Sequence, residues 1–207
     1  MTRDNYIIIP HPTEPKILIE QTANGWSLPC ITLPDKVLAM VEPLINAVWE
    51  RFGIDVTVLR RAQVSHTLGD DGEVQSAGIF ELENHSKTFV LPAAMRWIDD
   101  TEMSTLTIPD DAQRETIAAW WAAEAAAIPP SLRAPWAQKG WWESATEWIH
   151  DELARLGYTI SGSIVQVKQW GISSVLRVPT DKGLLFFKAL PPFFAIEPVI
   201  TDALARW

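Results

Sequence analysis

The stretch Pro34-Asp-Lys-Val-Leu-Ala-Met-Val-Glu-Pro-Leu-Ile-Asn-Ala-Val-Trp-Glu-Arg-Phe-Gly53 carries apolar side chains at intervals of three and four residues. This spacing places them on one face of an α-helix, because the helix turns once every 3.6 residues. Gly53 follows as a residue that readily adopts the left-handed backbone conformation of a helix C-cap. The stretch therefore predicts an amphipathic helix that ends at Gly53, with an apolar face made of Val37, Leu38, Val41, Leu44, Ile45, Val48, Trp49 and Phe52.

Short β-branched and aromatic runs on both sides of this helix predict strands. His11–Pro15 separates the first two runs in a hairpin-like pattern, and Asn24-Gly25 and Gly69–Gly72 mark further turns. Farther on, Asp110 is a candidate N-cap for a helix that runs through alanine-rich sequence to Ala127. The expected strands cover Tyr6–Pro10, Lys16–Glu20, Ile54–Leu59, Gly78–Leu82 and Thr88–Leu91.

The order of a strand, Gly25-Trp-Ser-Leu-Pro29 and a helix that ends Ala47-Val-Trp-Glu-Arg-Phe-Gly-Ile54 resembles a Nudix domain. The resemblance covers roughly residues 5–105. It implies an α+β fold, a mixed sheet with helices, and an ancestral hydrolysis of nucleoside diphosphate derivatives. In that family the helix carries an Arg-Glu pair and then a Glu-Glu pair, and the carboxylates hold magnesium against the diphosphate.

This chain departs from the family at those positions. The Arg-Glu pair falls on Asn46 and Ala47, and the Glu-Glu pair falls on Glu50 and Arg51. Magnesium requires an octahedral shell of oxygen ligands, so a helix with one carboxylate and an added guanidinium is a poor cation holder. We therefore expect a Nudix-like domain that is not catalytic and has no metal site, with Glu50 as the single metal-ligand candidate. A weak hydrolase that combines Glu50 with Glu42 is the alternative.

The charge distribution divides the chain near Pro129-Pro130. Residues 1–127 hold 9 basic and 19 acidic side chains, whereas residues 128–207 hold 8 basic and 7 acidic ones. Seven of the 11 tryptophans lie between residues 97 and 148, and three prolines interrupt residues 128–136. These features predict a first domain over residues 1–127, a Pro- and Trp-rich linker with a connector helix over 128–158, and a third part over 159–207.

The remainder of the chain predicts one helix, a meander of three strands and the start of another helix. The first helix has an apolar stripe that runs from Trp141 to Leu156, with Gly157 after it. Glycine-containing turns separate the three strand-like runs, and Pro198 suits the first turn of the last helix. The three expected strands are Ser163–Gln169, Ser173–Pro179 and Leu184–Ala189.

The motifs Arg133-Ala-Pro-Trp136, Lys139-Gly-Trp141 and Gln166-Val-Lys-Gln-Trp-Gly-Ile-Ser-Ser-Val-Leu-Arg-Val178 occur in an order similar to that of aminoglycoside phosphotransferase-like kinases. This resemblance covers about residues 132–207 and implies part of a kinase N-lobe, with a three-stranded antiparallel sheet and a helix. It also implies ATP and magnesium in the full-length family. The nucleotide-binding residues that it implies are Gly171, Ser173 and Ser174 in a phosphate-facing turn, Lys188 on the phosphates, and Glu197 as the partner of that lysine.

Lys188 also needs an anionic partner on physical grounds. It lies in the apolar run Leu184-Leu-Phe-Phe-Lys-Ala-Leu190, where an unpaired ammonium group would be costly to bury. The partner would be a phosphate, Glu197 or both. The alternative is that Lys188 reaches solvent from an edge strand and that Glu197 only favours the start of its helix.

These patterns lead to three hypotheses of function. In the first, the chain is the amino-terminal portion of an aminoglycoside phosphotransferase-like protein, a family that phosphorylates a small-molecule hydroxyl with ATP. We expect such a portion to be inactive alone, because no catalytic-loop aspartate or metal-binding aspartate follows Lys188 in the required order. In the second, the first domain is a ligand-binding or regulatory module. In the third, it is a weak nucleoside diphosphate hydrolase.

The composition of the chain limits the kinds of partner that we expect it to bind. A net charge of −9 without a basic cluster argues against a nucleic-acid partner, and no apolar run reaches the length of a membrane span. We expect a cytoplasmic protein, with a nucleotide or an unidentified small molecule as its ligand. Four phenylalanines between 186 and 194 predict an exposed apolar surface and a homodimer, or packing against the first domain.

Single residue types suggest little further chemistry. The only cysteine, Cys30, is either a buried apolar side chain or a nucleophile that needs a nearby histidine. The four histidines lack metal-ligand spacing. Asp70, Asp71 and Glu73 resemble the start of a calcium loop without its final glutamate, which favours a solvated turn.

Overall fold

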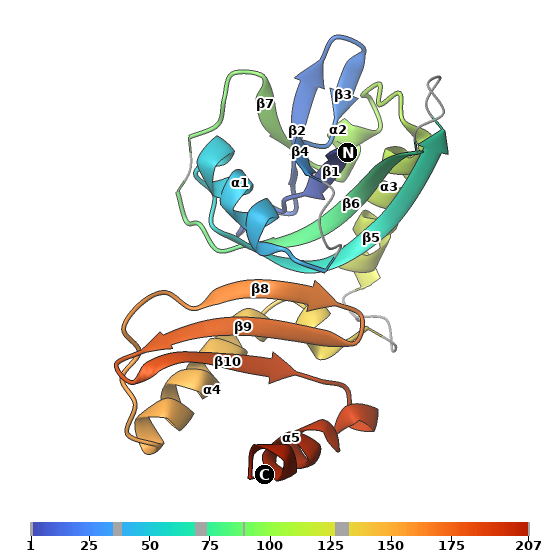
Figure 1. The fold of residues 1–207 in the computed structure, drawn as a ribbon. Coiled ribbons are helices and arrows are strands. Elements are labelled where there is room, and N and C mark those ends of the chain that lie inside the picture. The colour runs from blue at the N-terminus through green and yellow to red at the C-terminus, as the bar shows by residue number, and fades with distance from the viewer. Residues whose placement is uncertain (1, 35–38, 69–73, 89, 127–132, 207) are drawn as a thin grey trace. The chain divides into compact units, whose positions relative to one another are not determined.

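A computed structural model describes residues 2–34, 39–68, 74–88, 90–126 and 133–206 (Figure 1). The chain forms two compact units, Met1–Arg133 and Ala134–Trp207. Both units combine helices with strands, and the protein belongs to the α+β class that the sequence predicts. The expected turn at Gly69–Gly72, the calcium-like carboxylates and the Pro129-Pro130 joint lie outside the described residues. No helix within the described ranges is both long and apolar enough to span a membrane.

The first unit contains a four-stranded mixed sheet in the order β4-β1-β6-β5. Its strands are β4 (Cys30–Pro34), β1 (Thr2–Ile8), β6 (Val74–Asn84) and β5 (Val56–Leu68). β1 runs parallel to β6, with Ile7 opposite Phe80, while β1 with β4 and β5 with β6 are antiparallel. The mixed sheet that the sequence predicts is therefore present.

A second, antiparallel sheet has the order β3-β2-β7. It consists of β3 (Gly25–Ser27), β2 (Ile17–Thr22) and β7 (Met95–Ile98). The expected hairpin around His11–Pro15 links the two sheets instead of lying in one: β1 ends at Ile8, and the chain after it pairs with the start of β2 through the bridge between Pro10 and Ile17 and a 3.0 Å hydrogen bond from the Leu18 N–H to the Ile9 carbonyl oxygen. Asn24 lies in the tight turn between β2 and β3, as predicted.

The predicted strand at Thr88–Leu91 is wrong. Residues 88, 90 and 91 have no strand structure, and β7 begins only at Met95. Pro92 follows this run and cannot donate a backbone hydrogen bond to a neighbouring strand. Its carbonyl instead accepts a hydrogen bond of 2.9 Å from the Met95 N–H, which closes a turn.

At the end of β1 both faces of the chain are buried, and a different helix covers each face. Ile7 and Ile9 belong to a core that includes residues of α1 (Glu42–Phe52). Ile8 belongs to a second core that includes residues of α3 (Asp111–Ala126). Figure 1 shows α1 and α3 on opposite sides of the sheet. The short helix α2 (Asp100–Met103) follows β7.

The helix boundaries of this unit follow from local sequence. α1 begins at Glu42, next to Pro43, which is later than the apolar pattern suggested, and it buries Leu44, Val48 and Phe52. Trp49, expected on the apolar face, is 58% exposed. Gly53 caps α1 with φ 64°, as predicted. Asp110 caps α3, since its Oδ1 accepts a 3.0 Å hydrogen bond from the Gln113 N–H.

The second unit has the three-stranded meander that the sequence predicts, in the order β10-β9-β8. Ile149 and Leu153 of the connector helix α4 pack with Leu176 and Val178 of the sheet. Trp148 and Leu156, expected in the apolar stripe of α4, are more than half exposed. The elements are the 3₁₀ turn η1 (Pro135–Ala137), α4 (Trp141–Arg155), β8 (Val165–Trp170), β9 (Ser173–Thr180), β10 (Gly183–Ala189), the 3₁₀ turn η2 (Pro192–Phe194) and α5 (Glu197–Ala205).

Candidate functional site

Arg51, near the end of α1, joins this helix to both sheets of the first unit. Its guanidinium forms an ion pair with Glu20 of β2 and donates a hydrogen bond of 2.5 Å to the backbone oxygen of Cys30 in β4. It also lies 4.8 Å from the centre of the Phe52 ring. The helix position at which the Nudix resemblance implies a metal-binding carboxylate is therefore occupied by a cation with its own carboxylate partner.

The donor set around Arg51 does not fit magnesium. Glu50 is exposed, and the carboxylate of Glu20 is already paired with a guanidinium. Glu42 and Glu50 cannot share an ion, because eight residues along a helix separate them by about 12 Å. Within the described parts of the chain, no three His, Cys, Asp or Glu side chains gather closely enough to hold a metal ion.

A small hollow lies on the other face of the sheet, where α3 begins. Tyr6, Gln63, Asp110 and Gln113 contribute polar groups to its lining. Gln113 is 3% exposed, and its Oε1 accepts hydrogen bonds from the Leu28 N–H at 2.8 Å and from the Ser27 hydroxyl at 3.0 Å. The sequence indicated Asp110 only as a helix cap and did not indicate Gln113, because a single glutamine in a helix has no distinctive pattern.

Burial and neighbouring charge suppress ionisation in this part of the unit. Burial, followed by the proximity of Cys30, raises the pKa of Tyr6. The pKa of the Cys30 thiol rises to about 11, mainly through burial and then through the negative charge of Asp4, while Arg51 acts in the opposite direction. At neutral pH the thiol is protonated, which favours the buried apolar role for Cys30 over the nucleophilic one.

The second unit brings together the two charged residues that the sequence pairs. The Lys188 ammonium group on β10 forms an ion pair with the Glu197 carboxylate in the first turn of α5. Both side chains are about two-fifths exposed, at 41% and 42%. The short interval between them, which contains Pro191-Pro192, folds as the turn η2 and leaves the pair intact. Lys188 therefore reaches solvent from the edge strand β10, as in the second of the two alternatives, and Glu197 is also its ion-pair partner.

Sheet register places a second lysine beside Lys188. Val175 of β9 lies opposite Lys188 of β10 on one side and opposite Lys168 of β8 on the other. Directly paired residues of antiparallel strands project from the same face of a sheet, so both lysines share a face. Lys168 also lies 5.5 Å from the centre of the Trp170 ring. The sequence did not indicate Lys168, because its position depends on register.

The turn between β8 and β9, with the first residues of β9, contains the three residues to which the kinase resemblance assigns phosphate binding, Gly171, Ser173 and Ser174. Space around Gly171 is open, with no heavy atom within 4 Å of the position that a Cβ would occupy. Ser173 is 5% exposed and Ser174 is fully buried, with its hydroxyl 3.5 Å from the Lys168 carbonyl oxygen. Both serine side chains are therefore shielded from solvent in this structure.

Comparison with known proteins gives similarities of fold only. The sequence matches no protein-family model and no curated protein sequence. Among similar solved structures, the E. coli ORF135 protein has 20% identity and a TM-score of 0.47, over 61% of this chain and 92% of that one. A Nudix hydrolase from Nitrosomonas europaea has 14% identity and a TM-score of 0.45, over 63% and 93%. The Nudix hydrolase RenU from M. smegmatis has 16% identity and a TM-score of 0.41, over 64% and 90%.

The raised pKa of Cys30 predicts an unreactive thiol. At pH 7 a thiol of pKa about 11 has a thiolate fraction on the order of a hundredfold smaller than an ordinary cysteine. Iodoacetamide should therefore alkylate Cys30 about a hundredfold more slowly than glutathione, and the rate should increase up to about pH 11. Because Arg51 lowers this pKa, Arg51→Gln should slow the reaction further. Mass spectrometry of the alkylated chain measures the rate, and unfolding in urea should restore ordinary reactivity. A fast reaction at pH 7 in the folded chain would contradict the burial argument.

Proposed function

We propose that the first unit is a Nudix-like module that binds a nucleoside diphosphate derivative and does not hydrolyse it. The observation that carries this proposal is the contact of Arg51 with Glu20 and with the Cys30 carbonyl oxygen. An arginine at position 51 stands where the resemblance implies a carboxylate, and its guanidinium pairs with Glu20. These residues therefore cannot hold a divalent cation as a cluster of carboxylates would. A module of this kind has a binding or regulatory role.

Two features of the fold agree with this role. The mixed sheet is covered by α1 on one face and α3 on the other, which is the layout that the sequence resemblance implies. The lining of the small hollow beside α3 includes hydroxyl, amide and carboxylate groups, to which a single polar group of a ligand would form hydrogen bonds. Phosphate charge would then be compensated by arginine, whose planar guanidinium forms paired hydrogen bonds with phosphate oxygens.

Calorimetry with a panel of nucleoside diphosphate sugars tests this function. We expect at least one of them to bind with equal affinity in magnesium and in EDTA, and we expect Glu50→Gln to leave that affinity unchanged. Phosphorus NMR of the same mixtures should show no product. Magnesium-dependent turnover that Glu50→Gln abolishes would establish the hydrolase alternative, and a lack of binding across the panel would refute the ligand class.

The Lys188–Glu197 ion pair supports a second candidate function, for the second unit. In this candidate function, the second unit is part of the nucleotide-binding lobe of an aminoglycoside phosphotransferase-like protein. Lys188 contacts the phosphates of ATP, and Glu197 orients the lysine side chain. Gly171 leaves room for a phosphate to approach the backbone of the β8–β9 turn. The reaction of such a protein is ATP-dependent phosphorylation of a small-molecule hydroxyl. This candidate rests on motif order and on the geometry of the unit.

ATP binding to the whole chain tests the second candidate. Lys188→Ala should weaken the affinity for ATP by about tenfold or more, because a charge-assisted hydrogen bond contributes about 1.5–3 kcal/mol. Lys182→Ala is the matched control, since Lys182 lies in the turn between β9 and β10 and bonds to the Gly157 carbonyl oxygen. Isothermal calorimetry measures both variants. If the Lys188 variant and the parent chain bound ATP with equal affinity, Lys188 would not contact the nucleotide.

A further inference from the structure

Lys168 of β8 is held by an aromatic ring and not by a carboxylate. Its ammonium nitrogen lies 5.5 Å from the centre of the Trp170 ring, and among the described residues no carboxylate forms an ion pair with it. The indole group has no strong hydrogen-bond acceptor, so the ammonium N–H groups of Lys168 remain available to a ligand. Lys188 of β10, by contrast, is paired with Glu197.

An irregularity in β8 determines the face of the sheet from which Lys168 projects. The pairing of β8 with β9 shifts between Gln166 and Lys168. Gln166 lies opposite Leu176, whereas Lys168, two residues farther on, lies opposite Val175. In a regular strand, residues two apart project from the same face, so Lys168 would share the face of Gln166. The shift adds one residue, Val167, and moves Lys168 to the other face.

Two hydrogen bonds hold this bulge in place. Gln166 Nε2 donates to Gln169 Oε1 at 3.2 Å, and Gln169 Nε2 donates to the Trp136 carbonyl oxygen at 3.0 Å. Residues three apart in a regular strand point to opposite faces, so the contact between the two glutamines requires the added residue. Both glutamines are buried. The buried side of β8 therefore fixes the side to which Lys168 points.

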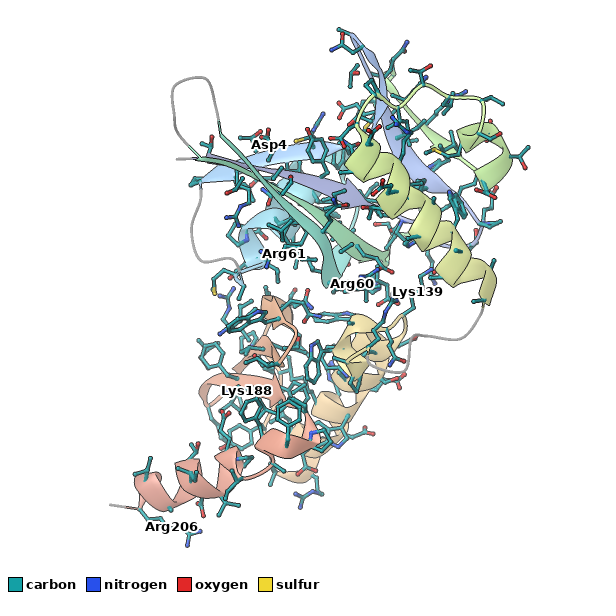
Figure 2. All side chains as sticks on the ribbon, turned by 90° about the vertical axis from the view of Figure 1, so that its right-hand side faces the viewer. Asp4, Arg60, Arg61, Lys139, Lys188 and Arg206 are labelled. Atoms are coloured by element: carbon teal, nitrogen blue, oxygen red, sulfur yellow. The ribbon has the colours of Figure 1, made fainter. Side chains whose placement is uncertain are left out.

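The bulge places Lys168 in line with Lys188 across the sheet. Val175 of β9 lies between the two lysines and is opposite both. Because neighbouring strands lie about 4.8 Å apart, the Cα atoms of the two lysines are about 10 Å apart, and their four-carbon stems can reach one ligand above Val175. Figure 1 shows the three strands in this order, and Figure 2 labels Lys188 on β10.

The lysines project from the face of the sheet that α4 does not cover. Leu176 follows Val175 and packs with Ile149 of α4, so Val175 and the lysines opposite it point the other way. Trp170, which shares the face of Lys168, is 54% exposed, and the Lys188 side chain is 41% exposed. A ligand in solution can therefore reach this row.

We propose that Lys168 and Lys188 form a two-lysine site that binds neighbouring phosphate groups of a linear polyphosphate. A chain of phosphates offers each ammonium group its own anionic oxygens, whereas a single phosphate would be shared. Two cations and the Glu197 carboxylate leave the row positively charged, which favours an anion. The polyphosphate is either free or part of a nucleoside triphosphate. For the nucleotide, the proposal rests on the second candidate function, in which Lys188 contacts ATP.

Calorimetry of the whole chain with inorganic tripolyphosphate, ATP and inorganic phosphate, without magnesium and at constant ionic strength, tests the site. We expect the parent chain to bind tripolyphosphate more tightly than phosphate. Lys168→Gln should weaken tripolyphosphate binding by about tenfold, because one charge-assisted contact is lost. Lys182→Gln is the matched control, since the Lys182 ammonium also lies over a ring, 4.5 Å from the centre of Tyr158. It should leave the affinity within about twofold, because salt screens an exposed charge outside the site.

A second variant and a second measurement separate binding from a structural role. Lys168→Met keeps the length of the side chain beside Trp170 and should show the same loss of affinity if Lys168→Gln does not fold. Without ligand, the variants should unfold close to the temperature of the parent chain, and tripolyphosphate should stabilise the parent chain more than either variant. A lysine with a structural role alone would lower the unfolding temperature and leave the affinity unchanged.

The same titrations separate this proposal from the candidate function. The two-lysine site is overturned if the parent chain binds neither tripolyphosphate nor ATP, or if Lys168→Gln binds the polyphosphate as tightly as the parent chain does. When ATP binding depends on Lys188 and not on Lys168, the candidate function stands and the two-lysine site fails. Tripolyphosphate binding that requires both lysines, in a chain that does not bind ATP, supports the site and refutes the nucleotide function.

Discussion

The first unit depends on the burial of both faces of one strand. Successive residues of a strand point to opposite faces, so the three consecutive isoleucines at 7, 8 and 9 require an apolar cover on each side. Each buried isoleucine contributes about 1.5–3 kcal/mol, which is lost if the helix that covers it is absent. α1 supplies one cover and α3 the other, and the parallel pairing of β1 with β6 holds the strand between them. The polar groups of the candidate sites lie where these covers end.

This two-sided cover explains why charged side chains acquire specific partners. α1 buries Leu44, Val48 and Phe52, and this face sets the rotation of the helix that brings Arg51 to Glu20 and to the Cys30 carbonyl oxygen. A guanidinium paired in this way competes with any divalent cation for the same carboxylate.

The sequence correctly predicted those features of the fold that depend on interactions between neighbouring residues. The end of α1 at Gly53, the cap of α3 at Asp110 and the meander of the second unit each depend on a few adjacent residues. The failures involve distant partners. Thr88–Leu91 has the composition of a strand, but its described residues 88, 90 and 91 do not form one, and the contact of Arg51 with Glu20 joins residues 31 positions apart. The positions of Gln113 and Lys168 depend on helix packing or strand register, which a single sequence does not specify. The Lys188–Glu197 pair could be predicted because the resemblance to aminoglycoside phosphotransferase-like kinases implies that these two residues are partners.

Electron paramagnetic resonance of Mn²⁺ titrated into the chain tests most directly whether Arg51 has displaced a cation site. The parent chain should leave the spectrum of free Mn²⁺ unchanged, because the Glu20 carboxylate is paired with Arg51 and the single carboxylate of Glu50 is too weak a ligand set to hold the ion. Arg51→Glu should bind Mn²⁺, since it releases Glu20 and adds a carboxylate beside Glu50. Tight Mn²⁺ binding by the parent chain that Glu50→Gln abolishes would show that a working metal site persists on α1 and would contradict the displacement.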